Sequence, residues 1–269
     1  MSGASTESET AERRPETDVS MTLWQHLGEL RNRILKAFIA LFLCTIVAWT
    51  FHEEALNVLL IPYKTALADR NMTGATELQT LAPGDALVGY MYLSLVVGLV
   101  AASPIVFYQL WAFISPGLYK REKKLVFPFV FFSTTLFVSG VVFAYYFVFP
   151  AALSYMLSLT GKVGDSGISL VHRPTLEYYL DFSTRLLLMC GCVFELPLFI
   201  SFLVVGGVVT PKQLLRFSRW AILLSFVVGA FVTPGPDVAF QLFVSLPLIA
   251  LYFISLGIAY LLAPKRLET

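Results

Sequence analysis

The residue most able to carry chemistry is Glu195, an acidic side chain inside a long apolar stretch of sequence. A carboxyl group at such a depth in a membrane is costly unless it faces water or a polar partner, so it usually marks function. Pro197 follows two residues later and should loosen the backbone around it. Arg185 lies about 15 Å away along a helix, too far for an ion pair. We therefore expect Glu195 to contact a polar partner within the membrane.

Two further carboxylates, Glu29 and Glu122, stand among basic residues outside the apolar stretches. Glu29 belongs to the amphipathic run WQHLGELR at 24–31, and Glu122 has basic neighbours on both sides in KREKK at 120–124. Taken alone, each is most simply a solvated charge or a local partner for Arg31 or Lys123. A role in binding a cationic ligand is the alternative.

Two other acidic residues have structural interpretations. Asp181 and Arg185 are four residues apart and share a helix face, which predicts a local salt bridge. Asp237 follows the turn sequence TPGP at 233–236, where an aspartate usually caps the next helix.

Catalytic motifs are absent from the sequence. The three histidines, His26, His52 and His172, lie outside the apolar stretches, so no serine–histidine pair can form within the membrane. No HExxH zinc motif, Walker phosphate loop or glycine-rich dinucleotide fingerprint occurs. Cys190 and Cys192 have no further metal ligands nearby. We expect no enzyme, no cofactor and no metal site.

The elements that must position these residues are membrane-spanning helices. Hydrophobic residues make up 57% of the 269 positions and charged residues only 14%, against about 25% charged in an average soluble domain. The apolar residues form six long stretches, and a helix needs about 20 residues to cross a bilayer. We predict an all-α membrane protein with six transmembrane helices at 34–51, 86–114, 125–149, 186–209, 220–232 and 240–262.

Several of these elements have individual features. Pro104 should kink the second helix, with neighbouring helices satisfying the freed carbonyl. The fifth stretch is short, so it must thin the bilayer or extend to Phe217 while Arg219 snorkels. A short interfacial helix at 56–67, broken at Pro62, is expected in the first loop, and the glycine-containing third loop is expected to be irregular.

The distribution of Lys and Arg predicts the orientation, because short cytoplasmic connections are rich in these residues. Basic residues gather before the first helix, at 120–124, at 212–219 and at 265–266, whereas the opposite loops hold few. Both termini should face the cytoplasm, with 53–85, 150–180 and 233–239 outside. The polar segment 1–20 is expected to be a disordered tail, 21–263 the membrane domain, and 264–269 a short cytoplasmic tail.

Several separated stretches between about residues 21 and 263 resemble the TatC family, the receptor subunit of the twin-arginine (Sec-independent) protein translocase. HLGELR at 26–31 is similar to the family's amino-terminal motif, and SPGLYKRE at 115–122 to its first cytoplasmic loop. Shorter similarities are SP at 103–104, YQLWAF at 108–113, FELP at 194–197, and TP at 233–234 with Asp237. Their order, spacing and predicted membrane sides agree.

This resemblance implies a function at the bacterial inner membrane. The family binds twin-arginine signal peptides of folded precursors at the cytoplasmic face and exports them with TatA and TatB, driven by the proton-motive force. Carboxylates suit this task because each guanidinium is a planar, permanently charged fork. Family analogy assigns signal-peptide binding to Glu29, Glu122, Phe113, Leu30, Arg31 and Tyr119. It assigns partner contact to Glu195 and Pro197, and structural roles to Pro104, Pro116 and Asp237. Membrane lipid and further copies of the chain are expected partners, and nucleic acid is not.

Two alternatives from other functional classes remain open at this point. In a proton-coupled transporter of a small solute, Glu195 would carry the proton, and Pro104 and Pro197 would mark broken helices. In a membrane scaffold, partner helices would bind but signal peptides would not.

Overall fold

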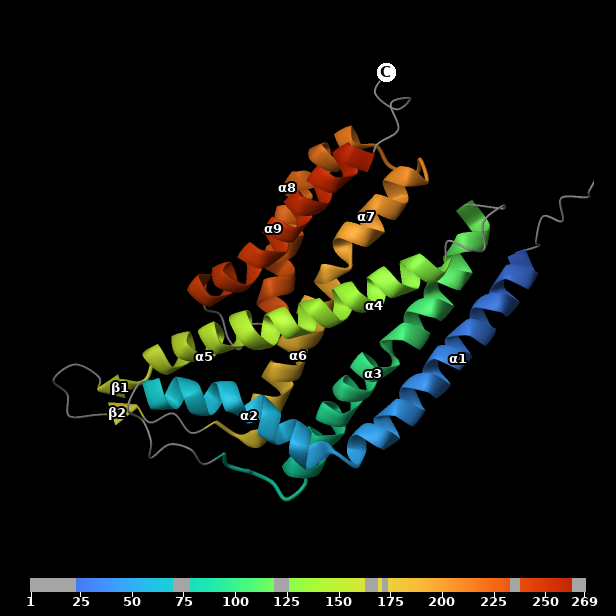
Figure 1. Ribbon diagram of the computed structural model, residues 1–269. Coiled ribbons are helices and arrows are strands. Elements are labelled where there is room, and N and C mark those ends of the chain that lie inside the picture. Colours follow the sequence, from blue (N-terminus) through green and yellow to red (C-terminus); the bar gives the residue numbers. More distant parts are fainter. Residues whose placement is uncertain are drawn as a thin grey trace, which may run out of the picture.

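The structure, a computed structural model, describes residues 23–69, 78–118, 126–162, 169–170, 174–232 and 238–262 of the chain (Figure 1). Six helical stretches are long and apolar enough to span a membrane. They are α1 (Leu23–Trp49), α3 (Asp85–Leu118), α4 (Val126–Phe143) continued by the π-helical turn η2 (Ala144–Val148) and α5 (Phe149–Ser158), α6 (Leu176–Phe194) continued by α7 (Leu196–Val205), α8 (Pro211–Val232), and α9 (Val238–Leu262). The predicted all-α fold with six transmembrane helices is confirmed.

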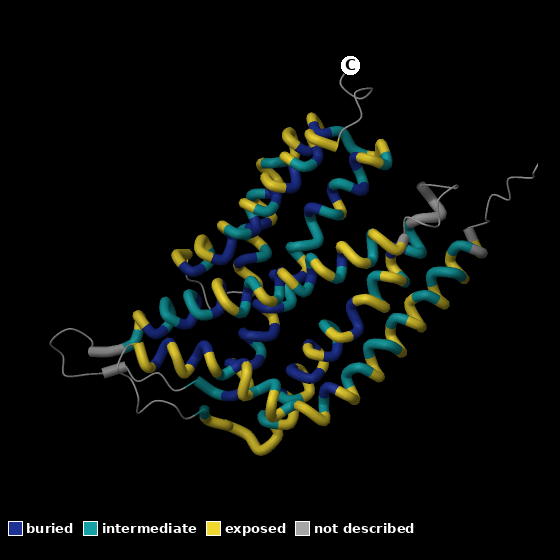
Figure 2. The backbone as a smooth tube through the Cα atoms, in the orientation of Figure 1, coloured by how far each residue is buried: buried dark blue, intermediate teal, exposed yellow. Residues whose placement is uncertain are grey.

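The helices form an elongated assembly in which α1 contributes little to the core. Figure 1 shows α1 alongside α3 at one edge, the pair α8 and α9 with α7 at the other, and α4 and α6 between them. Among the described side chains of α1 only Ala48 is buried, so most of this helix faces the surrounding lipid (Figure 2). One hydrophobic cluster centres on Phe149, Leu180 and Leu186, and a second joins α7, α8 and α9 around Val204 and Ala259.

Four predicted helix boundaries were wrong because the helices continue beyond the apolar stretches. The first span begins at Leu23 and not at 34, and the third continues through η2 and α5 to Ser158 and not to 149. The fourth span begins at Leu176, ten residues before the predicted 186. The ion pair between Asp181 and Arg185 lies within its first three turns. Helix α8 has 22 residues from Pro211 to Val232 and is therefore not short. It includes Phe217 and Arg219, both exposed, which matches the predicted extension of the fifth span.

The connection between the first two spans contains α2 (His52–Asp69), which runs through Pro62 without the predicted break. Proline has no N–H, so the carbonyl of Val58, four residues earlier, loses its helical donor. The hydroxyl of Tyr145 in η2 donates to this carbonyl at 2.7 Å. The hydroxyl of Tyr179 in α6 donates to the neighbouring carbonyl of Leu59 at 2.6 Å. Two tyrosines from the third and fourth spans thus stabilise α2 at its proline.

We expect Tyr145→Phe to lower the free energy of unfolding by about 1–3 kcal/mol, because the Val58 carbonyl is left without a donor. In a Pro62→Ala background the same substitution should cost less, since residue 62 then supplies its own N–H. Thermal unfolding of the four proteins in detergent measures this coupling. Tyr146→Phe is the matched control, because the adjacent Tyr146 is exposed. Equal costs of Tyr145→Phe in both backgrounds would contradict the explanation.

Pro104 lies inside α3, which remains helical from Asp85 to Leu118. The carbonyl freed by this proline is that of Val100, and it accepts a hydrogen bond of 2.7 Å from the hydroxyl of Ser103. The donor therefore comes from the preceding residue of the same helix, where a neighbouring helix was predicted. Pro116 lies in the last turn of the same helix.

The described parts of the loops that were predicted to lie outside contain pairing that was not predicted. A short antiparallel hairpin pairs β1 (Gly161–Lys162) with β2 (Ser169–Leu170) in the third loop, which was predicted to be irregular. The amide of Leu176 donates to the carbonyl of Gln79 at 2.8 Å, which ties the first loop to the start of α6. Thr175 caps α6 by accepting a hydrogen bond from the amide of Tyr178. These contacts fix the end of the molecule opposite to Glu29.

Candidate functional site

The amino-terminal end of α1 packs on the carboxyl-terminal end of α3. The rings of His26 and Phe113 stack with centroids 4.5 Å apart and planes inclined by 18°. This contact joins the stretches HLGELR and YQLWAF, which were predicted to contribute to one binding site. His26 was noted as the first residue of HLGELR, but its contact with Phe113 was not predicted. Glu29 lies three residues after His26 and hence on the same helix face.

The carboxylate of Glu29 is held by an ion pair within α1. Its Oε1 accepts hydrogen bonds from Nε of Arg33 at 3.0 Å and from Nη2 of the same guanidinium. The partner is therefore Arg33 and not Arg31, because residues four apart share a helix face whereas residues two apart do not. Leu30 is half-buried and Arg31 is exposed.

Some predicted site residues cannot be placed. Tyr119, Glu122 and Asp237 lie outside the described residues, as do both predicted tails up to Ser20 and beyond Leu262. The backbone of Pro116 is described but its side chain is not. The contribution of these residues to the site stays a prediction.

Glu195 occupies a break between α6 and α7. Its backbone is in a turn, and Pro197 lies buried in the first turn of α7, where a missing N–H is tolerated. The amide of Phe199 still donates to the carbonyl of Glu195 at 2.9 Å, so the chain resumes helix at once. The proline does loosen the backbone at the carboxylate, as predicted.

A buried hydrogen bond between α3 and α4 lies next to the Glu195 carboxylate. Nε1 of Trp111 in α3 donates to Oγ of Ser133 in α4 at 2.7 Å, and both side chains are buried. Ser133 lies beside the Glu195 carboxylate, close enough to interact with it. One oxygen of this carboxylate, Oε1, is buried and has no hydrogen-bond partner among the described residues. Neither Trp111 nor Ser133 was predicted to lie near Glu195. Their polar groups within apolar stretches are the feature that could have indicated it.

The predicted salt bridge between Asp181 and Arg185 is confirmed. Nε of Arg185 lies 2.7 Å from Oδ1 of Asp181 within α6. The Arg185 side chain is 61% exposed, so the pair is a local helix contact and leaves Glu195 without a cationic partner from this residue.

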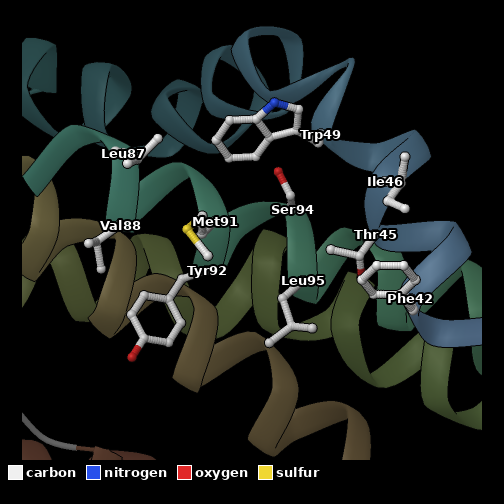
Figure 3. Close-up of a pocket in the computed structure, with 10 residues that line it drawn as sticks. All are labelled: Phe42, Thr45, Ile46, Trp49, Leu87, Val88, Met91, Tyr92, Ser94 and Leu95. Atoms are coloured by element: carbon white, nitrogen blue, oxygen red, sulfur yellow. The ribbon is translucent and has the colours of Figure 1, made fainter. Parts of the chain in front are cut away.

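A groove of about 670 Å³ lies between α1 and α3 (Figure 3). Its lining includes Phe42, Trp49, Met91 and Tyr92 and contains no charged side chain. These residues belong to the half of α1 and α3 remote from His26 and Phe113. The groove therefore offers no carboxylate that could pair with an arginine, and the charged end of α1 is the better candidate. Among the described residues no cluster of side chains could hold a metal ion.

This chain is similar to known proteins over most of its length. The family described as Sec-independent protein translocase protein (TatC) matches residues 25–247. The Sec-independent protein translocase protein TatC of Koribacter versatilis is 36% identical over 246 residues, covering 91% of this chain and 88% of the relative. The protein of the same name from Aquifex aeolicus is 34% identical over 248 residues, covering 92% and 98% respectively.

The fold recurs in a solved structure. The crystal structure of a twin-arginine translocase receptor, TatC, has a TM-score of 0.76 and 34% identity, and the match covers 88% of this chain and 99% of that one. Because the family match spans most of the sequence and the whole solved fold is reproduced, this chain belongs to the TatC family and is a multi-pass membrane component of the Sec-independent protein translocase.

Proposed function

We propose that this protein is the translocase subunit that binds twin-arginine signal peptides of folded precursors at the cytoplasmic face of the bacterial inner membrane. The observation that supports this most is the packing of His26 on Phe113, which brings the Glu29 face of α1 to the end of α3. An acidic side chain next to an aromatic ring suits a guanidinium, which can bind both. Glu122 would supply the second carboxylate by family analogy.

The orientation of the chain in the membrane is part of the same proposal. Arg31 and Lys36 near the start of α1, and Arg216 and Arg219 near the start of α8, are exposed. Basic residues at these helix ends favour a cytoplasmic location for both termini. The signal peptide would then approach from the compartment in which precursors are folded.

Glu195 would recruit the transmembrane helices of TatA or TatB. Its buried Oε1 lacks a donor, and a polar side chain on a partner helix would supply one. Such a hydrogen bond in a membrane is worth about 1 kcal/mol, which suits reversible assembly driven by the proton-motive force. Several copies of the chain would take part in the active complex.

The proposal predicts that a fluorescent twin-arginine signal peptide binds the purified protein in nanodiscs. Glu29→Ala and Glu122→Ala should each weaken binding about tenfold, because a charge-assisted hydrogen bond is worth about 1.5–3 kcal/mol. A twin-lysine peptide should also bind more weakly, because lysine lacks the planar fork. Glu53→Ala, an exposed carboxylate on α2, is the control. Binding that is insensitive to both substitutions would reject the site.

A further inference from the structure

We propose that Arg33 competes with the signal peptide for Glu29 and thereby sets the affinity of the site. The inference rests on the proposed function of Glu29 and concerns the regulation of that same carboxylate. In the free protein the position that a ligand guanidinium would take is already occupied by a guanidinium of the same helix.

The contact between Arg33 and Glu29 imitates the contact expected for the ligand. Two nitrogens of Arg33, Nε and Nη2, donate to the same carboxylate oxygen. Hydrogen bonds between charged groups are stronger than those between neutral groups. The two side chains are only 22% and 26% exposed, so water screens them less than it screens a fully exposed pair.

A ligand cannot avoid this competition by approaching Oε2 of Glu29. No described residue donates to Oε2, but a guanidinium arriving there would stand next to the positive charge of Arg33. Two cations would then share one negative charge, and like charges at that separation repel each other. Signal-peptide binding must therefore displace Arg33 or tolerate its repulsion, and either route lowers the affinity.

Lys36 provides a matched control on the same helix. It lies seven residues after Glu29, on the same face and about 10.5 Å along the axis. Lys36 is exposed and forms no ion pair among the described residues, so its removal changes only the long-range charge. A gain in affinity that is the same in Arg33→Gln and Lys36→Gln is therefore due to the loss of one positive charge near the site. An additional gain in Arg33→Gln measures the competition for Glu29.

The test is binding of a synthetic twin-arginine signal peptide to the full chain in nanodiscs. Arg33→Gln should tighten binding about two- to fivefold beyond Lys36→Gln, the range expected for releasing a partly exposed ion pair. Arg33→Lys should give a smaller gain, because it keeps the charge but loses the fork. In a Glu29→Gln background, Arg33→Gln and Lys36→Gln should become equivalent.

The outcomes separate this inference from the proposed function. If Glu29→Gln weakens binding but Arg33→Gln binds no more tightly than Lys36→Gln, the competition is overturned and the receptor site stands. If Glu29→Gln has no effect on binding, the site itself is rejected. A gain in Arg33→Gln that persists in the Glu29→Gln background would also overturn the competition, because the released group would then not be Glu29.

Discussion

Replacing Gly98 with leucine is expected to separate α1 from α3 and to destabilise the protein. A Cβ atom at position 98 would lie 2.6 Å from Oγ1 of Thr45, 2.7 Å from its Cα and 2.8 Å from its amide nitrogen. Two of these three atoms belong to the backbone of α1 and cannot rotate away. Small residues at such crossings allow membrane helices to approach closely, and packing contacts of this kind hold them together in lipid.

The cost of this substitution should exceed that of ordinary overpacking, which is typically about 1–3 kcal/mol. The clash begins at Cβ, so even Gly98→Ala should be destabilising, and leucine more so. Thermal unfolding in detergent measures the loss. Since α1 carries Glu29 and α3 carries Phe113, signal-peptide binding should be lost together with the packing.

Gly257→Leu is the matched control for this prediction. Gly257 lies in α9, and a Cβ atom there would meet nothing within 4 Å. The same side chain added at this position should leave the unfolding temperature close to that of the unmodified protein. A Gly98→Leu protein that unfolds at the same temperature as the Gly257→Leu protein would contradict the close approach of α1 and α3.

The six spans could be predicted from the sequence because hydropathy alone identifies them. Their ends could not, because a hydropathy pattern stops at the first charged residues whereas a helix does not. Helix α6 begins at Leu176 and accommodates Asp181 and Arg185 by pairing them with each other. Helix α8 begins at Pro211 and keeps its arginines exposed. The pairing of Asp181 with Arg185 and the exposure of Arg219 were predicted from local spacing, but hydropathy alone did not indicate that the helices begin before these residues.

The continuity of α2 depended on residues far away in the sequence. A proline at position 62 locally predicts a break, and the local argument is sound. The helix persists because Tyr145 and Tyr179, which lie 87 and 120 residues from their acceptors, donate to its carbonyls. Ser103 provides the contrasting case, since its bond to Val100 is local and the dipeptide Ser103-Pro104 could have suggested it.

The charged residues of the candidate sites could be predicted from the sequence. The residues that hold them in position could not. Glu195 stood out because an ionisable side chain in an apolar stretch is rare. Trp111 and Ser133 looked like ordinary members of their helices. The packing of α3 against α4 joins them to each other, and the packing of α4 against α6 places Ser133 near Glu195. The partner of Glu29 could have been predicted from helical spacing, which favours Arg33 over Arg31.

Replacing Trp111 with alanine should have the second large effect, because this side chain joins three helices. It is 3% exposed, and its ring lies 4.9 Å from Phe129 of α4 and 4.9 Å from Phe202 of α7, measured between centroids. Truncating a buried aromatic side chain to alanine typically costs about 3–5 kcal/mol. Trp220→Ala is the control, since Trp220 is 58% exposed and faces lipid. Similar unfolding temperatures for the two variants would contradict the central position of Trp111.

Trp111→Phe separates the packing role of this residue from its hydrogen bond. The phenyl ring keeps most of the contacts but cannot donate to Ser133, so we expect a loss of only about 1 kcal/mol in stability. Ser133 is then free to turn towards a carbonyl of its own helix, as serines within helices commonly do. The Glu195 carboxylate would then lose its orientation. Photo-crosslinking from Leu198 in α7, three residues after Glu195, to a helix of TatA or TatB should fall. If crosslinking falls only in Trp111→Ala, packing alone positions Glu195; if it falls equally in Trp111→Phe, the hydrogen bond from Trp111 to Ser133 sets the direction in which the free oxygen points.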